Sequence, residues 1–171
     1  MIRVKNCTTD DAALIADMSR QTFYETFASA NTARDMDMFM TEQFTREALI
    51  KEVDTPGNIF FLAYEDDKPV GYFRMRESAC PPGIGKRSAL EIARIYAVKE
   101  AIGKGVGSLL MQTCIDEAKK RSKDVLWLGV WEMNQRAIDF YIRWGFEKFS
   151  THPFLLGTDL QTDWLMKKEL M

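Results

Sequence analysis

The glycine-rich segment GKGVG at residues 103–107 limits the possible folds of this chain more than any other feature. An apolar, strand-like run at residues 89–98 precedes it, and residues 108–121 follow it with apolar side chains at helical spacing. A second short apolar run comes next, at residues 125–130. A strand, a tight turn, a helix and a strand in this order are typical of a βαβ unit. The segment therefore predicts an α/β fold with a mixed sheet and at least one βαβ crossover.

The whole chain, residues 1–171, fits one domain, because it shows no linker, internal repeat or low-complexity tract. Residues 31–54 indicate one or two helices that end at a Pro-Gly pair, and a loop rich in proline and glycine spans residues 78–88. The other expected elements are a strand at 2–6, a helix at 12–27, a hairpin at 58–64 and 69–77, a helix at 134–144 that ends before Gly145, and a strand pair at 146–154 and 162–170.

Composition narrows the class of protein. Hydrophobic residues make up 46% and charged residues 28%, which is typical of a globular protein. The formal net charge is −2, whereas a general nucleic-acid binder carries a basic surplus, so we expect no nucleic-acid partner. Three widely spaced cysteines and a single histidine, His152, argue against a disulfide framework and a metal site. Because no apolar run reaches the ~18 residues that span a bilayer and no signal peptide is visible, we expect a cytoplasmic protein without a membrane partner.

The glycine-rich turn is also a candidate phosphate site. Glycines allow positive φ angles and close approach of a ligand to the backbone, and the free N–H groups at the start of the following helix favour an anion. A diphosphate would fit, but a tight strand-to-helix turn would need glycine as well. The turn is neither of two common phosphate motifs. Ser108 and Leu110 stand where a GxGxxG fingerprint would need its third glycine, and no Walker A sequence occurs.

A second group of residues lies on the helix expected at 134–144. Helical spacing places Asn134, Ala137 and Tyr141 on one face. The small Ala137 between two polar side chains leaves room for a ligand chain to pass. The alternative is an ordinary amphipathic helix with core aromatics, and we prefer that interpretation for Phe140 and Phe146.

These residues together resemble the GNAT superfamily of N-acetyltransferases. The segment Arg94-Ile95-Tyr96-Ala97, the GKGVG turn and the Asn134, Ala137, Tyr141 helix carry the resemblance, which covers essentially the whole chain. It implies a mixed, mostly antiparallel twisted sheet flanked by helices, with a central βαβ unit that binds acetyl-CoA as co-substrate. The implied cofactor-binding residues are Ile95, Tyr96, Ala97, Gly103, Lys104, Gly105, Val106, Gly107, Ser108, Asn134, Ala137 and Tyr141.

A narrower resemblance is to the PaiA-type spermidine/spermine acetyltransferases. The segments that carry it are residues 90–96, 127–132 and 161–163, together with the start of the first helix. It implies a small-molecule amine acceptor, with a polyamine as the specific candidate. The acidic residues of the N-terminal helices would suit such a cation, and we expect at most two of them to line the site. These residues are Glu25, Asp35, Asp37 and Glu42.

Amide formation from a thioester needs a neutral amine, a polarised carbonyl and a protonated leaving group. An alkyl amine has a pKa near ~10.4, so a base must take its proton at neutral pH. Glu91, Glu132 or a water relay could serve, and Glu91 lies on the cofactor strand. The family resemblance implies that main-chain amides of residues 95–97 polarise the acetyl carbonyl as an oxyanion hole does. It also implies that Tyr141 protonates the departing thiolate, so no covalent acyl-enzyme is needed.

Two other functions stay open at this level. A GNAT fold could bind CoA as a regulatory module, or it could acetylate the amines of peptides or proteins. His152 could border the acceptor site or be structural. Exposed aromatic side chains near Trp127 or Trp164 would support a homodimer.

Overall fold

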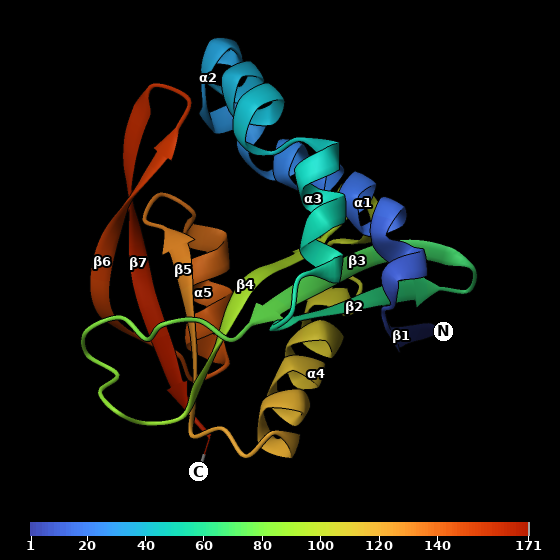
Figure 1. The fold of residues 1–171 in the computed structure, drawn as a ribbon. Coiled ribbons are helices and arrows are strands. Elements are labelled where there is room, and N and C mark those ends of the chain that lie inside the picture. The colour runs from blue at the N-terminus through green and yellow to red at the C-terminus, as the bar shows by residue number, and fades with distance from the viewer. Residues whose placement is uncertain (171) are drawn as a thin grey trace.

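The computed structural model describes residues 1–170 and contains a twisted seven-stranded sheet in the order β1-β2-β3-β4-β5-β7-β6 (Figure 1). Strands β4 and β5 are parallel, and every other neighbouring pair is antiparallel. The strands are β1 (Ile2–Asn6), β2 (Asn58–Glu65), β3 (Lys68–Arg76), β4 (Ala89–Ala97), β5 (Val125–Trp131), β6 (Glu147–Leu156) and β7 (Asp159–Glu169). The predicted mixed, mostly antiparallel sheet is confirmed.

Helices cover both faces of the β1–β4 part of this sheet. Figure 1 shows α1 and α3 on one face and α4 on the other. The helices are α1 (Ala12–Phe27), α2 (Ala33–Met38), α3 (Arg46–Asp54), α4 (Val106–Lys120) and α5 (Gln135–Arg143), with short turns η1 (Thr9–Asp11), η2 (Ala28–Ala30), η3 (Phe39–Gln43) and η4 (Lys99–Ala101). Since α4 connects the parallel strands β4 and β5, the predicted βαβ unit is confirmed.

The main core packs α1, α4 and α5 against the sheet. Leu110, Met111 and Cys114 of α4 are fully buried there, which accounts for the apolar spacing of that helix. Gly71 on β3 permits the close approach, because a Cβ at this position would lie 2.8 Å from the carbonyl oxygen of Tyr96 and 3.1 Å from Leu110. Helix α4 is therefore held tightly against β3 and β4, and its N-terminus is fixed relative to the sheet.

The segment between α1 and β2 forms a second core with the tip of the β6–β7 hairpin. Its buried members include Phe23, Phe39 and Leu156. A polar contact joins the same parts, because Asp35 on α2 accepts hydrogen bonds from the backbone nitrogen and the hydroxyl of Thr158, at 2.8 and 2.7 Å. The one or two helices predicted here are two α-helices separated by a π-helical turn, η3.

One detail of the sequence-based interpretation is wrong. Trp127 is not an exposed aromatic residue, because it packs with Ile84, Ala89 and Leu165 in a small buried cluster. Trp164 is partly buried and carries the ammonium group of Lys148 over its ring, 4.4 Å from the centroid. The homodimer therefore stays a prediction, but the exposed aromatic side chains on which it was based are not present at Trp127 or Trp164. Across residues 1–170, no helix has the length and apolarity needed to cross a membrane.

Candidate active site

The site begins where the two parallel strands separate. Strands β4 and β5 pair at only three positions, from Ala89 with Val125 to Glu91 with Trp127, and then diverge (Figure 1). Their C-terminal halves border a cleft of about 880 Å³. The register of β4 against β3 also shifts here, since Arg74 pairs with Arg94 and the next residue, Met75, pairs with Ile92. Ala93 is therefore an extra, bulged residue that bends β4 at the edge of the cleft.

The divergence leaves main-chain amides of β4 free. Val98 donates its N–H to Val70 on β3, at 2.9 Å. Because N–H groups alternate in direction along an antiparallel strand, the amides of Ile95 and Ala97 point away from β3, toward the cleft. The amide of Tyr96 points toward β3, although the residue itself also lines the cleft. Two of the three amides that the family resemblance implies therefore point toward the cleft.

The glycine turn lies at one end of the same cleft. Gly103 and Gly105 have φ angles of 87° and 88°, a region that disfavours other residues, and Gly105 is the N-cap of α4. A Cβ at either glycine would meet no atom within 4 Å, so this backbone faces open space. The first-turn amides of α4, from Val106 to Ser108, have no acceptor within the helix. This geometry suits an anion that approaches the main chain closely.

Helix α5 supplies the opposite wall. The side-chain oxygen of Asn134 caps the helix by accepting from the N–H of Ala137, at 3.3 Å. Asn134, Ala137 and Tyr141 all line the cleft, as their spacing predicted. Burial raises the pKa of the Tyr141 phenol, so it keeps its proton at neutral pH.

Cationic side chains also line the cleft, although the sequence analysis does not single them out. They are Lys99 after β4 and Arg136 and Arg143 on α5. Their charge would complement phosphate groups bound at the turn. The turn, these cations and the facing side of α5 are called the turn half of the cleft below.

Aromatic side chains form the other half of the cleft. Phe23 and Phe39 stack with ring centroids 4.6 Å apart, and Phe39 lies 5.9 Å from Phe154 on β6. Phe27 on α1 lies 6.0 Å from Trp131 at the end of β5. The lining residues of this aromatic half are Phe23, Phe27, Phe39, Phe44, Arg94, Tyr96, Trp131, Phe154, Leu156, Gln161 and Asp163.

Asp163 on β7 is the one carboxylate among these lining residues, and burial raises its pKa. His152 stands opposite on β6, with Nε2 3.9 Å from Oδ2 of Asp163, and its positive charge, when present, lowers that pKa. Residues 161–163 are among the segments that resemble the PaiA-type acetyltransferases. No local signal in the sequence, however, shows that the Asp163 side chain reaches the cleft. Glu25 also lines the cleft, but its carboxylate accepts the N–H of Lys99 at 3.1 Å.

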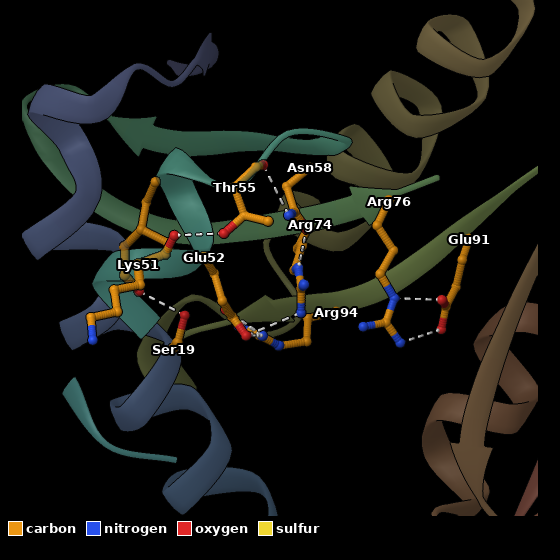
Figure 2. Close-up of polar contacts among 10 residues, drawn as sticks. Ser19, Lys51, Glu52, Thr55, Asn58, Arg74, Arg76, Glu91 and Arg94 are labelled. Carbon is orange, nitrogen blue, oxygen red and sulfur yellow. Dashed lines mark hydrogen bonds and ion pairs between the residues drawn. The ribbon is translucent and has the colours of Figure 1, made fainter. Parts of the chain in front are cut away.

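Several predicted residues lie outside the cleft lining. Glu91 is buried and accepts from Arg76 Nε at 2.6 Å and from Ser78 Oγ at 3.0 Å, so the geometry does not support it as the base (Figure 2). Glu132 is exposed. Lys104 is exposed and does not line the cleft, and the Val106 side chain is buried in the core, so Val106 could contribute only its backbone. Of the four acidic residues in the N-terminal helices, Asp35, Asp37 and Glu42 do not line the cleft. Among residues 1–170, no group of three or more His, Cys, Asp or Glu side chains could hold a metal ion.

Comparisons with known proteins agree with this geometry. The model of the acetyltransferase (GNAT) family matches residues 20–146. An uncharacterized N-acetyltransferase in the pepI 3′ region of Lactobacillus delbrueckii subsp. lactis is 35% identical over 170 residues, 99% of this chain and 98% of that protein. The crystal structure of the PaiA N-acetyltransferase from Thermoplasma acidophilum in complex with coenzyme A superposes with a TM-score of 0.79 at 20% identity, over 99% of both chains. The yncA structure from Salmonella typhimurium, with acetyl-CoA, gives 0.74 at 18% identity, over 100% of this chain and 95% of that one.

Proposed function

Because this chain belongs to the acetyltransferase (GNAT) family and is an N-acetyltransferase, we propose that it transfers the acetyl group of acetyl-CoA directly to a primary amine of a small molecule. The observation that carries the proposal is the cleft at the divergence of β4 and β5. It joins a backbone site for an anion to a walled chamber lined by one carboxylate. A donor in the turn half and an acceptor in the aromatic half would meet beside Tyr141.

The turn half fits the co-substrate. The open space over Gly103 and Gly105 would take a diphosphate, held by the first-turn amides of α4 and by the nearby cations. The amides of Ile95 and Ala97 would bind the pantetheine arm and the acetyl carbonyl oxygen, between β4 and α5. Acetyl-CoA supplies an activated thioester, so the protein needs only to position the two reactants and move protons.

Asp163 is the proposed acceptor of the amine proton, in place of Glu91. Its raised pKa lies closer to neutral pH than that of an exposed aspartate, which favours proton transfer from an ammonium group. The neutral amine nitrogen then forms a bond to the carbonyl carbon and loses its second proton to solvent, and the carbon–sulfur bond breaks with its electron pair on sulfur. Tyr141 donates its phenolic proton to that sulfur and regains a proton from solvent.

The polyamine acceptor implied by the PaiA resemblance stays a prediction. Asp163 and Glu25 support it, because each could face one ammonium group. The structure neighbour of that type shares 20% identity, which bears on the fold alone.

The test is release of CoA thiol from acetyl-CoA by the purified protein with a panel of polyamines, aminoglycosides, amino acids and peptides. We expect amine-dependent thiol release with at least one small amine, together with an acetylated product of the matching mass. Tight CoA binding without turnover of any amine would favour a regulatory module. Turnover of peptides alone would favour a protein N-acetyltransferase.

A further inference from the structure

A cluster of charged residues beneath the aromatic half contains more cations than anions. Arg94 donates from Nη2 to both carboxylate oxygens of Glu52 on α3, at 2.6 and 2.7 Å, and Arg74 on β3 donates to the same carboxylate at 3.2 Å (Figure 2). Two guanidinium groups thus share one carboxylate. The neighbouring pair of Arg76 and Glu91 is balanced and supplies no spare anion.

The two arginines differ in how well their donors are satisfied. Arg74 also donates from Nε to the side chain of Asn58, at 2.7 Å. Nη1 of Arg94 is buried and has no hydrogen-bond partner among the described residues. Burial lowers the pKa of Arg94, but the Tyr72 hydroxyl and the Glu52 carboxylate more than offset this and raise it, so Tyr72 interacts with the guanidinium over a distance longer than a normal hydrogen bond. A buried charged donor without an acceptor is costly, so native structures pair nearly all of them.

Arg94 and Arg74 also differ in their position relative to the cleft. Arg94 lines the cleft and keeps 11% of its side chain exposed, whereas Arg74 does not line the cleft. The guanidinium carbon of Arg94 lies 5.2 Å from the ring centroid of Phe44, which is itself part of the aromatic wall. An anion in the aromatic half would therefore meet Arg94 rather than Arg74, and it would add the negative charge that the cluster lacks.

From this geometry we propose that the acceptor is an amine with a carboxylate on an apolar, preferably aromatic, body, and that Arg94 binds the carboxylate. The planar guanidinium matches a carboxylate in shape and charge. The rings of Phe23, Phe27, Phe39 and Trp131 would pack against the body of the acceptor, and Asp163 would face its amine. This proposal rests on the proposed function and names its substrate class. It competes with the polyamine prediction, because a polyamine brings no anion to Arg94.

The test compares amines that differ only in the carboxylate. L-Phenylalanine is paired with phenethylamine, 4-(aminomethyl)benzoate with benzylamine, and spermidine is included. In at least one pair, kcat/KM should be about 10- to 100-fold higher for the carboxylate, the range expected for a hydrogen bond to a charged group. Arg94→Met should reduce that ratio to near one, mainly through KM. Arg74→Met is the matched control, because it loses a bond to the same Glu52 but should keep the ratio.

Other outcomes would overturn the proposal. Equal kcat/KM within both pairs, an unchanged ratio in Arg94→Met, or turnover of spermidine alone would each do so. If Arg94→Met does not fold, Arg94→Lys replaces it, since a lysine keeps the charge without the planar fork and should give an intermediate ratio. If no amine is turned over, calorimetry that compares the binding of 4-(aminomethyl)benzoate and benzylamine tests the carboxylate site instead. Preferential binding of the benzoate by the wild-type protein would support the carboxylate site even though the proposed function had failed.

Discussion

The two halves of the cleft are built from different parts of the polypeptide. The turn half relies largely on main-chain groups, namely the glycine turn and the start of α4, to which the cations and the facing side of α5 are added. The aromatic half relies on side chains from α1, β6, β7 and the segment around Phe39 and Phe44, which are distant in sequence. A main-chain site tolerates side-chain changes around it, whereas a side-chain site changes its ligand with each substitution. The first half thus suits a ligand common to a family, and the second suits an acceptor particular to one member.

Tyr141 lies where the halves meet and is the side chain on which transfer should depend most. Tyr141→Phe keeps the ring and removes only the hydroxyl, so kcat should fall about 10²- to 10⁴-fold while CoA affinity changes little. Steady-state kinetics and calorimetry with CoA give the two values. Tyr64→Phe, on β2 and outside the cleft lining, serves as control and should retain full activity. If Tyr141→Phe stays within about threefold of wild type, the tyrosine only packs against the donor and water protonates the thiolate.

A side chain added to the glycine turn should weaken ligand binding in the turn half. In Gly105→Val, a branched side chain must adopt a φ of 88° and projects into the open space over the turn. We expect CoA affinity to fall about 10- to 100-fold, because the anion loses one or two charged hydrogen bonds. Calorimetry with CoA measures the loss.

Gly85→Val is the matched control for that substitution. Gly85 has a φ of 78° and open space around it, but it lies outside the cleft lining. Both variants should lose similar stability, about 1–3 kcal/mol for a strained residue, and only Gly105→Val should lose CoA binding. Equal CoA affinities in the two variants would show that the turn is not the diphosphate site.

The same contrast explains how much the sequence could predict. The turn half depends on local features, such as glycines before a helix and the spacing of Asn134, Ala137 and Tyr141, so the sequence identified most of it. The aromatic half depends on which distant segments meet. Nothing near Asp163 in the sequence shows that it lines the cleft. Nothing near Arg94 in the sequence shows that it donates hydrogen bonds to the same carboxylate, Glu52, as Arg74 does.

Two further differences between the sequence-based expectations and the structure, at Glu91 and at the β6–β7 hairpin, also depend on pairing with other segments. Strict alternation along β4 would put Glu91 and Arg94 on opposite faces, but the bulge at Ala93 puts them on the same face, and Glu91 then pairs with Arg76. The sequence pattern predicts that the strands of the β6–β7 hairpin are separated by a loop at residues 155–161. Its strands in fact continue to a two-residue turn at Gly157 and Thr158, which Asp35 of α2 stabilises from outside the hairpin.

The smallest expected effect tests the carboxylate of the aromatic half. Burial raises the pKa of Asp163 above the ~3.9 of an unfolded chain, so the folded state holds this proton more tightly than the unfolded state. Stability should therefore decrease as pH rises from the ordinary aspartate pKa through the raised value, and then stay level. Asp163→Asn should remove this decrease, which urea unfolding at a series of pH values would measure.

If Asp163 accepts the amine proton, kcat/KM of the wild type also decreases below the raised pKa, and the variant lacks that acid limb with an activity about tenfold lower. The rate loss is modest because water can accept the proton instead. An acid limb that persists in Asp163→Asn would assign it to another group, whereas a flat stability difference would show that the folded protein does not hold the Asp163 proton more tightly.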